Sequence, residues 1–547
     1  MMKKWIPVIL LCLLVGSSSV PVHAAWLDVK TFGAVGDGKT LDSPAINKAI
    51  ETAAAAGGGT IYIPAGTYLC FSIRLKSNIA LYLDQGATIL AADPAEGQGR
   101  YDLPEPNEWD MYQDFGHSHW QNSLIWGIGL ENISILGPGL IHGKGLTRRG
   151  PGPRRPVQAG DTPVSLLNRT DPVAPRPERP PDSESQFESM NGQGNKAIAL
   201  KLCRNVVLRD FSMLLGGHFA LLATGVDNFT IDNLKVDTNR DGLDIDSCRN
   251  VRISNCSVNS PNDDAIVLKS SFALGFARAA ENITITNCQV SGYDLGSFLD
   301  GTFKRTQLLA PDRDGVTGRI KLGTESNGGF KNITISNIVF DRCRGLALET
   351  VDGALLEDIA ISNITMRDIV NSPLFLRLGA RMRGPKGIPV GRLGRVSISN
   401  VVVYNADPRF ASIISGIPDH DIEDVKLSHI RIYYQGGGTR LQAALEPAEK
   451  ADQYPEPSMF GEMPVYGFFI RCVRGITLED VEIDYLKEDL RPAFLLDNVK
   501  DAGFHHVKAR HAPEVPTFVL KKVEGFSAHQ CGSVPDIKLD SVIRKEF

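Results

Sequence analysis

A short unit that recurs along most of the chain constrains the fold more than any other feature. Each unit opens with Asn or a substitute and continues apolar–x–apolar, as in Asn228-Phe-Thr-Ile and Asn250-Val-Arg-Ile. The shortest spacings are about 22 residues, and longer ones fit one turn of a coil plus a loop. Short strands of period two, repeated without helices between them, predict an all-β fold, a single-stranded right-handed parallel β-helix. The first residues of the units are Asn132, Asn205, Asn228, Asn250, Asn282, Asn332, Asp358, Arg395, Asp424 and Gly475.

The repeated Asn also argues against the other all-β folds. A β-sandwich gives turn signals every 8–12 residues or so and does not reuse one Asn position. Asn282-Ile-Thr and Asn332-Ile-Thr match the N-glycosylation motif. We instead expect these Asn side chains to stack inward as a ladder.

One short helix is expected near the N-terminus, before the repeats begin. Pro44 to about Ala55 carries apolar residues on one face and follows Asp42, a residue type that caps helices. Two strands, 60–63 and 67–71, should follow it.

The first 24 residues have the pattern of an export signal. A charged start at Lys3-Lys4, an apolar run and small residues up to Ala24 predict a signal peptide over 1–24. We therefore expect a secreted or periplasmic protein with one β-helix catalytic domain over 25–547 and no membrane span. The net charge of −5 does not favour nucleic acid as a partner.

The cysteines are expected to be mostly free. Cys12 lies in the signal segment, which leaves eight of the nine in the exported chain. Cys256 and Cys288 occupy the same place in successive units, which indicates stacked, buried thiols.

Two segments interrupt the repeats and are predicted to be long surface loops. Residues 145–186 are rich in Pro and Arg, and residues 441–464 include Tyr454-Pro-Glu-Pro.

The chemistry of the chain is concentrated in a group of aspartates. Asp241 and the pair Asp263-Asp264 are separated by one repeat unit, so they should lie on adjacent turns, whose strands are about 4.7–4.9 Å apart. Carboxylates that close do not all ionise freely, and one with a raised pKa can act as an acid. Two such carboxyl groups are what cleavage of a glycosidic bond requires. The whole group is Asp237, Asp241, Asp244, Asp246, Asp263 and Asp264.

These motifs resemble glycoside hydrolase family 28, the polygalacturonases, over residues 27–370 and more weakly beyond. The family's N-T-D is matched by Asn239-Arg240-Asp241, its D-D by Asp263-Asp264, its Lys by Lys269 and its G-S-E by Gly323-Thr-Glu325. The resemblance implies a pectin-lyase-like β-helix and an inverting mechanism. In it Asp263 is the general acid, and Asp241 and Asp264 hold and deprotonate the attacking water. The residues expected to contact substrate are Asn239, Lys269, Glu325, Glu349 and His218.

The chain also departs from the family pattern. The family's G-H-G is Gly292-Tyr-Asp here, and His218, His117 and His119 are candidates to replace its histidine. The family's G-L-R-I-K-T, whose Arg and Lys bind the galacturonate carboxylate, is Gly345-Leu-Ala347-Leu-Glu349-Thr. Ala347 and Glu349 would repel a carboxylate, so we expect a different sugar there, such as a neutral one. The string Arg319-Ile-Lys321 precedes the Glu325 motif, and we interpret it as a coincidence unless an insert folds it back.

Taken together, the residues predict a monomeric glycoside hydrolase of the O-glycosyl type, acting on a pectin-type polysaccharide or oligosaccharide without metal or cofactor. Two alternatives stay open. A calcium-dependent polysaccharide lyase could use Asp237, Asp241, Asp263 and Asp264 for the cation and Lys269 as the base. A non-catalytic glycan-binding β-helix is the other.

Overall fold

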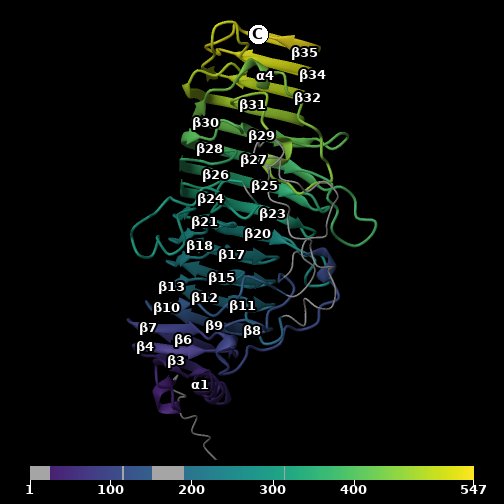
Figure 1. The fold of residues 1–547 in the computed structure, drawn as a ribbon. Helices are drawn as coiled ribbons and strands as arrows, with labels where there is room; N and C mark the ends of the chain where they lie inside the picture. Colours follow the sequence, from purple (N-terminus) through teal and green to yellow (C-terminus); the bar gives the residue numbers. More distant parts are fainter. Residues whose placement is uncertain (1–24, 114–115, 151–189, 313) are drawn as a thin grey trace, which may run out of the picture.

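The computed structural model describes residues 25–113, 116–150, 190–312 and 314–547. The predicted signal peptide and most of the predicted loop 145–186 lie outside the described residues. The rest of the chain winds into one elongated coil of parallel strands, with the N-terminal turns at one end and the C-terminal turns at the other (Figure 1). The predicted parallel β-helix is confirmed.

The strands stack in three ladders, in which each strand pairs in parallel with its counterpart one turn further along. Ladder A follows the repeated unit of the sequence. Its strands are β1 (Ala25–Asp28), β3 (Gly59–Ile63), β6 (Ile79–Leu83), β9 (Glu131–Leu136), β12 (Arg204–Arg209), β15 (Asp227–Asp232), β18 (Arg249–Ser254) and β21 (Ala280–Thr286), followed by β24 (Phe330–Asp341), β26 (Leu355–Arg367), β28 (Arg392–Ala406), β30 (Ile422–Gly436), β31 (Phe468–Lys487), β32 (Phe494–His505) and β34 (Phe518–His529).

Ladder B lies next along each turn and merges with the ends of the longer ladder A strands from β24 onward. Its separate strands are β2 (Asp37–Leu41), β4 (Gly66–Cys70), β7 (Ala87–Ala91), β10 (Leu140–His142), β13 (Ser212–Leu214), β16 (Lys235–Asp237), β19 (Ser257–Asn259), β22 (Gln289–Ser291) and β33 (Lys508–Ala509).

Ladder C precedes ladder A on each turn and carries the functional site. Its strands are β5 (Ile73–Arg74), β8 (Ile125–Ile128), β11 (Lys196–Lys201), β14 (Phe219–Thr224), β17 (Asp241–Asp246), β20 (Ile266–Ser270), β23 (Ile320–Ser326), β25 (Leu346–Thr350), β27 (Leu374–Leu378) and β29 (Ser412–Ser415).

The predicted N-terminal helix is confirmed as α1 (Ser43–Ala55), which has Pro44 in its first turn. Its buried face, which includes Ile46, Ala49 and Ile50, packs against the first turns of the coil. A second helix, α4 (Arg440–Ala443), lies in the predicted loop 441–464. The 3₁₀ turns are η1 (Val29–Phe32), η2 (Pro94–Glu96), η3 (Asp110–Tyr112) and η4 (Pro457–Phe460).

The repeated Asn forms a ladder, but its direction was predicted wrongly. Asn228 has φ 52° and Asn250 has φ 54°, and both side chains are exposed. The Nδ2 amide of each donates to the Oδ1 of its counterpart one turn back, at 3.0 Å and 3.3 Å. The position is a left-handed turn, which Asn and Gly adopt more readily than other residues. Gly475, with φ 71°, meets the same requirement.

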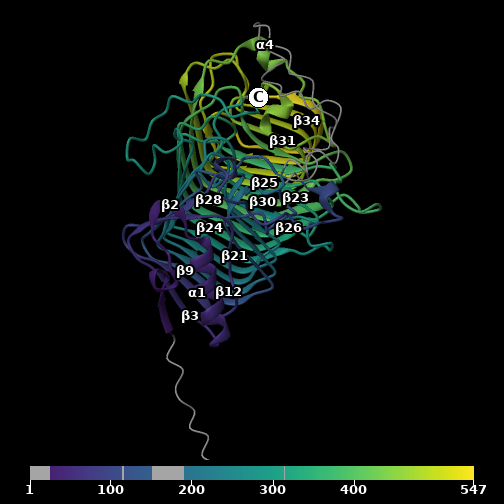
Figure 2. The same cartoon turned by 60° about the horizontal axis from the view of Figure 1, so that its bottom comes forward.

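The interior of the coil is filled by the apolar residues that alternate along each strand. In β18 these are Val251 and Ile253, both 1 % exposed or less, while Arg252 between them points outward. Figure 2, turned toward the N-terminal end, shows the strands wrapped around this core. The eight described cysteines are buried and free, which confirms that prediction for the described residues.

The last strand breaks the parallel pattern. β35 (Ile537–Glu546) pairs antiparallel with β34, with Val542 opposite Val523. It therefore closes the C-terminal end of the coil.

Among the described residues, no helix combines the length and apolar character that crossing a bilayer requires.

Candidate active site

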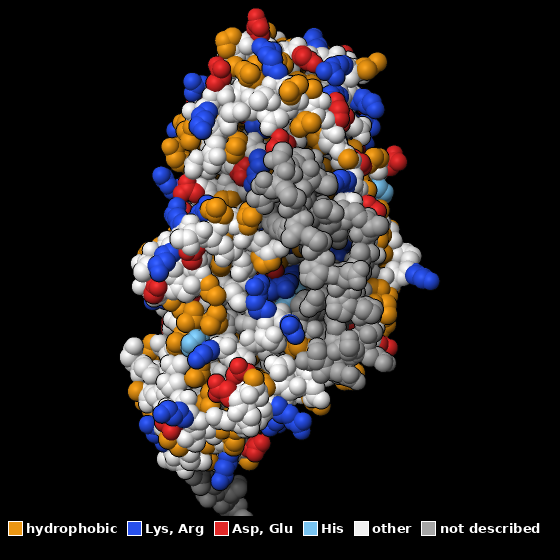
Figure 3. Space-filling view, in the orientation of Figure 1, with side chains coloured by type: hydrophobic (Ala, Val, Ile, Leu, Met, Phe, Trp, Pro, Cys, Tyr) orange, Lys and Arg blue, Asp and Glu red, His pale blue; other side chains and the backbone are white. Residues whose placement is uncertain are grey.

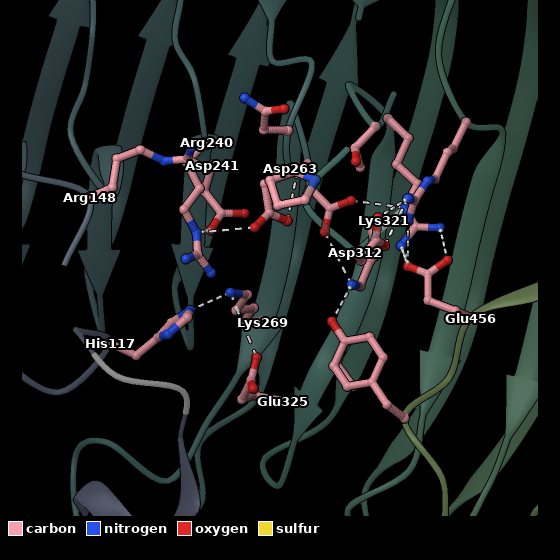
Figure 4. A pocket seen from close by; sticks show the side chains of 18 residues that line it. His117, Arg148, Arg240, Asp241, Asp263, Lys269, Asp312, Lys321, Glu325 and Glu456 are labelled. Carbon is pink, nitrogen blue, oxygen red and sulfur yellow. Dashed lines mark hydrogen bonds and ion pairs between the residues drawn. The ribbon is translucent and has the colours of Figure 1, made fainter. Parts of the chain in front are cut away.

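A cavity of about 280 Å³ lies on the outer side of ladder C (Figure 4). Its size is near the lower end of the range of about 300–1,000 Å³ for small-molecule sites. Basic side chains also gather near the middle of the face of the coil shown in Figure 3. The described acidic residues that line the cavity are Asp241, Asp263, Asp264, Asp312, Glu325 and Glu456. The described basic lining residues, apart from His117, are Arg148, Arg240, Lys269, Arg319, Lys321 and Arg344.

The structure brings together the three aspartates that the sequence placed on adjacent turns. One carboxylate oxygen from each of Asp241, Asp263 and Asp264 lies within 4.8 Å of the others. Pairing of β17 with β20 produces this proximity, because the Gly242 amide donates to the Asp264 carbonyl at 3.0 Å. The Asp263 side chain accepts the Asp264 amide at 3.0 Å, which fixes the pair locally.

The environments of these carboxyl groups favour opposite protonation states. Burial, followed by repulsion from Asp263, raises the pKa of Asp241 well above its ordinary value. Asp264 is equally buried, but the Lys321 ammonium and the Arg319 guanidinium outweigh that effect and hold its pKa well below its ordinary value. Divergent pKa values in one site are the usual basis of an acid and a base working together.

Arg240 connects the carboxyl groups of Asp263 and Asp241. Its Nε lies 3.1 Å from Asp263 Oδ2 and 3.7 Å from Asp241 Oδ2. The Asp263 side chain is 30 % exposed, against 3 % for Asp241 and Asp264, so Asp263 is the carboxyl group most open to the cavity.

Arg319 and Lys321 belong to the site, because the insert folds this string back to the aspartates, which is the exception that the sequence left open. The chain leaves the coil after β22 and re-enters at β23, with Lys321 opposite Val267 of β20. Arg319 Nε donates to Asp264 Oδ1 at 2.8 Å, and Lys321 Nζ lies 3.1 Å from Asp264 Oδ2. The insert therefore returns the two cations to the turn next to the aspartates.

Ala347 and Glu349 lie one turn further along, and neither is among the lining residues. Glu349 is fully buried, with its Oε2 3.9 Å from Lys321 Nζ, and burial raises its pKa to about 7. Ala347 packs in an apolar cluster with Met459 and Phe460. The expected contact of Glu349 with substrate is therefore wrong, because its side chain is fully buried. The expected repulsion of a carboxylate by these two positions stays a prediction.

Lys269 and Glu325 line the cavity as predicted, and a network beneath it connects them. Lys269 Nζ lies 2.8 Å from Asp244 Oδ2 and 3.7 Å from Glu325 Oε2. Although burial opposes it, Asp244 and the other nearby carboxylates raise the pKa of Lys269 well above its ordinary value. His117 contacts both Lys269 and Asp244, with its Nε2 3.2 Å from Asp244 Oδ2.

Of the three candidate histidines, only His117 lines the cavity. His218 is fully buried, and its Nδ1 bonds the Arg148 carbonyl at 2.7 Å, so its predicted contact with substrate is wrong. His119 bonds Glu105 and Asp110 instead. Asn239 is likewise not among the lining residues, whereas its neighbour Arg240 is.

The remaining aspartates of the predicted group support the surrounding chain. Asp237 accepts the amides of Gly296, Phe298 and Leu299 at 3.0–3.1 Å, and so fixes the start of the insert. Asp246 accepts the Ser271 amide at 2.8 Å.

A wall of the cavity comes from the loop 441–464, a role that the sequence did not indicate. Tyr454 Oη lies 3.0 Å from Thr324 Oγ1 and 3.4 Å from Lys321 Nζ. Glu456 pairs with Arg319, and its Oε1 lies 3.2 Å from Arg344 Nη1. The local signal was the Tyr454-Pro-Glu-Pro string, which marked a loop with polar and aromatic groups but not its destination.

The three aspartates are close enough to share a cation, as the lyase alternative requires, but their surroundings do not suit one. Arg240, Arg319 and Lys321 each lie within 3.1 Å of one of these carboxylates. Asp237, the fourth expected ligand, already accepts three amides. The residues present therefore fit a calcium ion poorly.

Comparisons with known proteins agree with this fold. Residues 26–107 match a family model described as rhamnogalacturonase A/epimerase, pectate lyase-like, and residues 183–310 match one for the right-handed β-helix region. A probable polygalacturonase from Vitis vinifera is 22 % identical over 495 residues, covering 85 % of this chain and 86 % of the relative. An exo-poly-α-D-galacturonosidase from Dickeya chrysanthemi is 27 % identical over 47 % of this chain and 43 % of its own length. The solved family 28 exopolygalacturonase of Yersinia enterocolitica has a TM-score of 0.58 at 18 % identity, covering 90 % of this chain and 79 % of that chain.

These findings define the class as a right-handed parallel β-helix protein with a carboxylate-lined cavity on its side. Within that class, the chain is similar along most of its length to a probable polygalacturonase, and it shares its fold with a family 28 exopolygalacturonase.

Proposed function

We propose that this chain is a glycoside hydrolase that cleaves O-glycosidic bonds in a pectin-type polysaccharide or oligosaccharide. The observation that carries the proposal is the aspartate cluster, in which Asp241 favours the protonated form and Asp264 the ionised form. Its relatives named for polygalacturonase activity support the substrate class. By the predicted signal peptide, we further propose that the enzyme acts outside the cytoplasm.

In this mechanism, Asp241 holds a proton, and a carboxyl oxygen of Asp241 lies within 4.8 Å of one of Asp263. Asp263 is the one of the two that opens to the cavity, and we assign it the transfer of the proton to the leaving oxygen. Asp264, held ionised by Arg319 and Lys321, accepts a proton from the attacking water.

The stereochemical outcome is a separate question. Acid and base are about 6.5–9.5 Å apart in most inverting glycosidases and about 5–5.5 Å apart in retaining ones. The three aspartates each offer an oxygen within 4.8 Å of the others, and the family resemblance implies inversion. Proton NMR of the first product anomer decides between the two, and retention would remove the water-activating role from Asp264 without removing the hydrolase assignment.

The shape of the cavity favours attack at a chain end. A volume of about 280 Å³, with a wall that includes Tyr454 and Glu456, suits one or two sugar units better than the middle of a polymer. We expect monosaccharide or disaccharide products from the earliest time points.

The test is a reducing-end assay on pectic polysaccharides and oligosaccharides, with and without a chelator, while ultraviolet absorbance is recorded. Hydrolysis gives new reducing ends without absorbance and is indifferent to the chelator. Absorbance that needs calcium would replace this proposal with a lyase. Sugar binding without any new reducing ends would favour the non-catalytic alternative.

A further inference from the structure

Glu456 is a carboxylate of the cavity wall that comes from the loop 441–464. Its two oxygens accept from the Nη1 and Nη2 groups of Arg319, and the Nη1 bond measures 3.2 Å. Its Oε1 also lies 3.2 Å from Arg344 Nη1, and the residue is 8 % exposed. Because Arg319 keeps Asp264 ionised, a group that fixes Arg319 acts indirectly on a carboxylate assigned to the reaction.

Apolar packing also holds Glu456 at this place. Glu456 directly precedes η4, and its carbonyl accepts the Met459 amide at 2.9 Å. Met459 and Phe460 of η4 are buried in an apolar cluster with Ala347 of β25 and Phe375 of β27. This burial stabilises the loop without any charge, so we expect the loop to keep its position when the Glu456 carboxylate is removed.

The contact with Glu456 determines which part of the Arg319 guanidinium meets Asp264. Arg319 Nε donates to Asp264 Oδ1 at 2.8 Å, whereas both Nη groups donate to Glu456. Lys321 Nζ lies 3.1 Å from the other oxygen, Asp264 Oδ2. An oxygen of an ionised carboxylate accepts about two hydrogen bonds, so each Asp264 oxygen can still accept one more.

If Glu456 were absent, the guanidinium of Arg319 could bind Asp264 through two hydrogen bonds instead of one. Paired, parallel hydrogen bonds are the arrangement that a guanidinium and a carboxylate favour, and the second bond would come from an Nη group. That bond would occupy a position on Asp264 that otherwise can accept from water. The Arg319 charge, no longer shared with Glu456, would also favour the ionised form of Asp264 further. Both changes would make Asp264 a weaker base.

We propose that Glu456 is a positioning residue for hydrolysis, which keeps the Nη groups of Arg319 away from Asp264 so that Asp264 can accept a proton from the attacking water. This inference rests on the proposed function and adds to it a residue that acts through Arg319. The alternative is a purely structural role, in which Glu456 only secures the loop. That alternative predicts a lower melting temperature without a specific effect on kcat.

The kinetic test measures reducing ends well below the melting temperatures of the variants. Glu456→Ala should lower kcat by about 10–100-fold and change KM by less than about threefold, because the loss falls on the base and not on substrate binding. Glu456→Gln keeps the size and one acceptor but not the charge, so its kcat should fall between those of the wild type and Glu456→Ala. The matched control is Glu449→Gln, since Glu449 lies in the same loop, pairs with Arg377 and Arg471 and does not line the cavity. Its kcat should stay near the wild-type value.

A double-mutant cycle with Arg319 separates positioning from a structural role. Arg319→Lys keeps the charge but has no Nη groups for Glu456 to hold. In that background, Glu456→Ala should lower kcat by less than about threefold, because the two residues act as a unit. A full 10–100-fold loss in the Arg319→Lys background would show that Glu456 does not act through Arg319.

A crystal structure of Glu456→Ala tests the inference independently of turnover. Arg319 should be turned so that an Nη group as well as Nε meets Asp264. An Arg319 that still meets Asp264 through Nε alone, a loss confined to KM, or a kcat near the wild-type value would each overturn the assignment. A wild type that releases no reducing ends from any pectic substrate would refute the proposed function instead, and the orientation of Arg319 would still decide what Glu456 does.

Discussion

The outer face of ladder A and the cavity side of ladder C are built from the same coil but use charge in opposite ways. Where ladder B merges with the end of ladder A, Arg431 pairs with Glu482 one turn away, and the two side chains are 56 % and 38 % exposed. On ladder C, Arg319 pairs with Asp264 and Glu456 with 2 % exposure. Exposed pairs contribute about 0–1 kcal/mol, whereas breaking a buried pair costs about 3–5 kcal/mol. The coil itself therefore needs little from its surface charges, whereas the site is sensitive to the loss of either member of a buried pair.

The largest effect should come from Asp263→Asn. The amide keeps the size of the side chain but has no acidic proton to transfer, so kcat should fall by about 10²–10⁴-fold. Turnover measured from reducing ends, together with binding of the same oligosaccharide, checks this. Near-full activity in this variant would refute the role of Asp263.

The next effect tests the contrast between the two faces directly. Arg319→Met leaves the buried Asp264 and Glu456 carboxylates without their shared cation, and we expect a loss of about 3–5 kcal/mol in the free energy of unfolding. Arg431→Met is the matched control, with a loss of at most about 1 kcal/mol. Denaturant unfolding measures both, and equal losses would mean that burial does not distinguish the two ladders.

Glu349 should make the stability of the fold depend on pH. Burial raises the pKa of its carboxyl group from 4.5 to about 7. The folded state binds this proton more tightly than the unfolded state does. The resulting stability is fully present below the pKa of the unfolded chain and is lost as pH rises through about 7. Glu349→Gln lacks this loss, so its stability relative to the wild type should increase by roughly 1–3 kcal/mol between pH 4.5 and 7.5. Unfolding curves across that range provide the measurement, and a difference independent of pH would contradict burial of the Glu349 carboxyl group as the cause.

The smallest effect concerns the regular face. Asn228→Ala forces a left-handed turn on alanine and should cost about 1–2 kcal/mol. Asn228→Gly suits that turn but removes the same amide ladder. If both variants lose equal stability, the amide hydrogen bonds rather than the backbone turn are what the repeat preserves.

The regular part of the molecule was predictable because its signals are local. The Asn or Gly that opens each unit marks a turn that few other residues adopt, and the alternating apolar residues mark the strands between turns. Asp241 and Asp263-Asp264 were predictable for the same reason, since neighbouring units become neighbouring turns.

The rest of the site could not be predicted because long inserts supply it. Lys321 reaches Asp264 only because the insert after β22 returns to the next turn, and its length gives no hint of this. Glu456 comes from a loop more than a hundred residues away in the chain. Arg148 stands at the edge of the segment predicted as a loop, where composition marks charge but not position. The outward direction of the Asn ladder was missed for another reason, because a polar residue at a repeated position suits either side of a turn.

The antiparallel strand β35 covers the last turn of the described coil. A parallel coil grows by adding one similar turn to another, so an uncovered last turn would offer its free backbone groups to a further copy, as exposed sheet edges do in fibres. β35 covers that edge in the reversed direction and alternates charged with apolar residues, among them Lys538, Asp540 and Arg544. At the opposite end, α1 packs against the first turns. Both ends of the described coil are therefore covered by an element that does not repeat, which disfavours stacking of a further copy on either end.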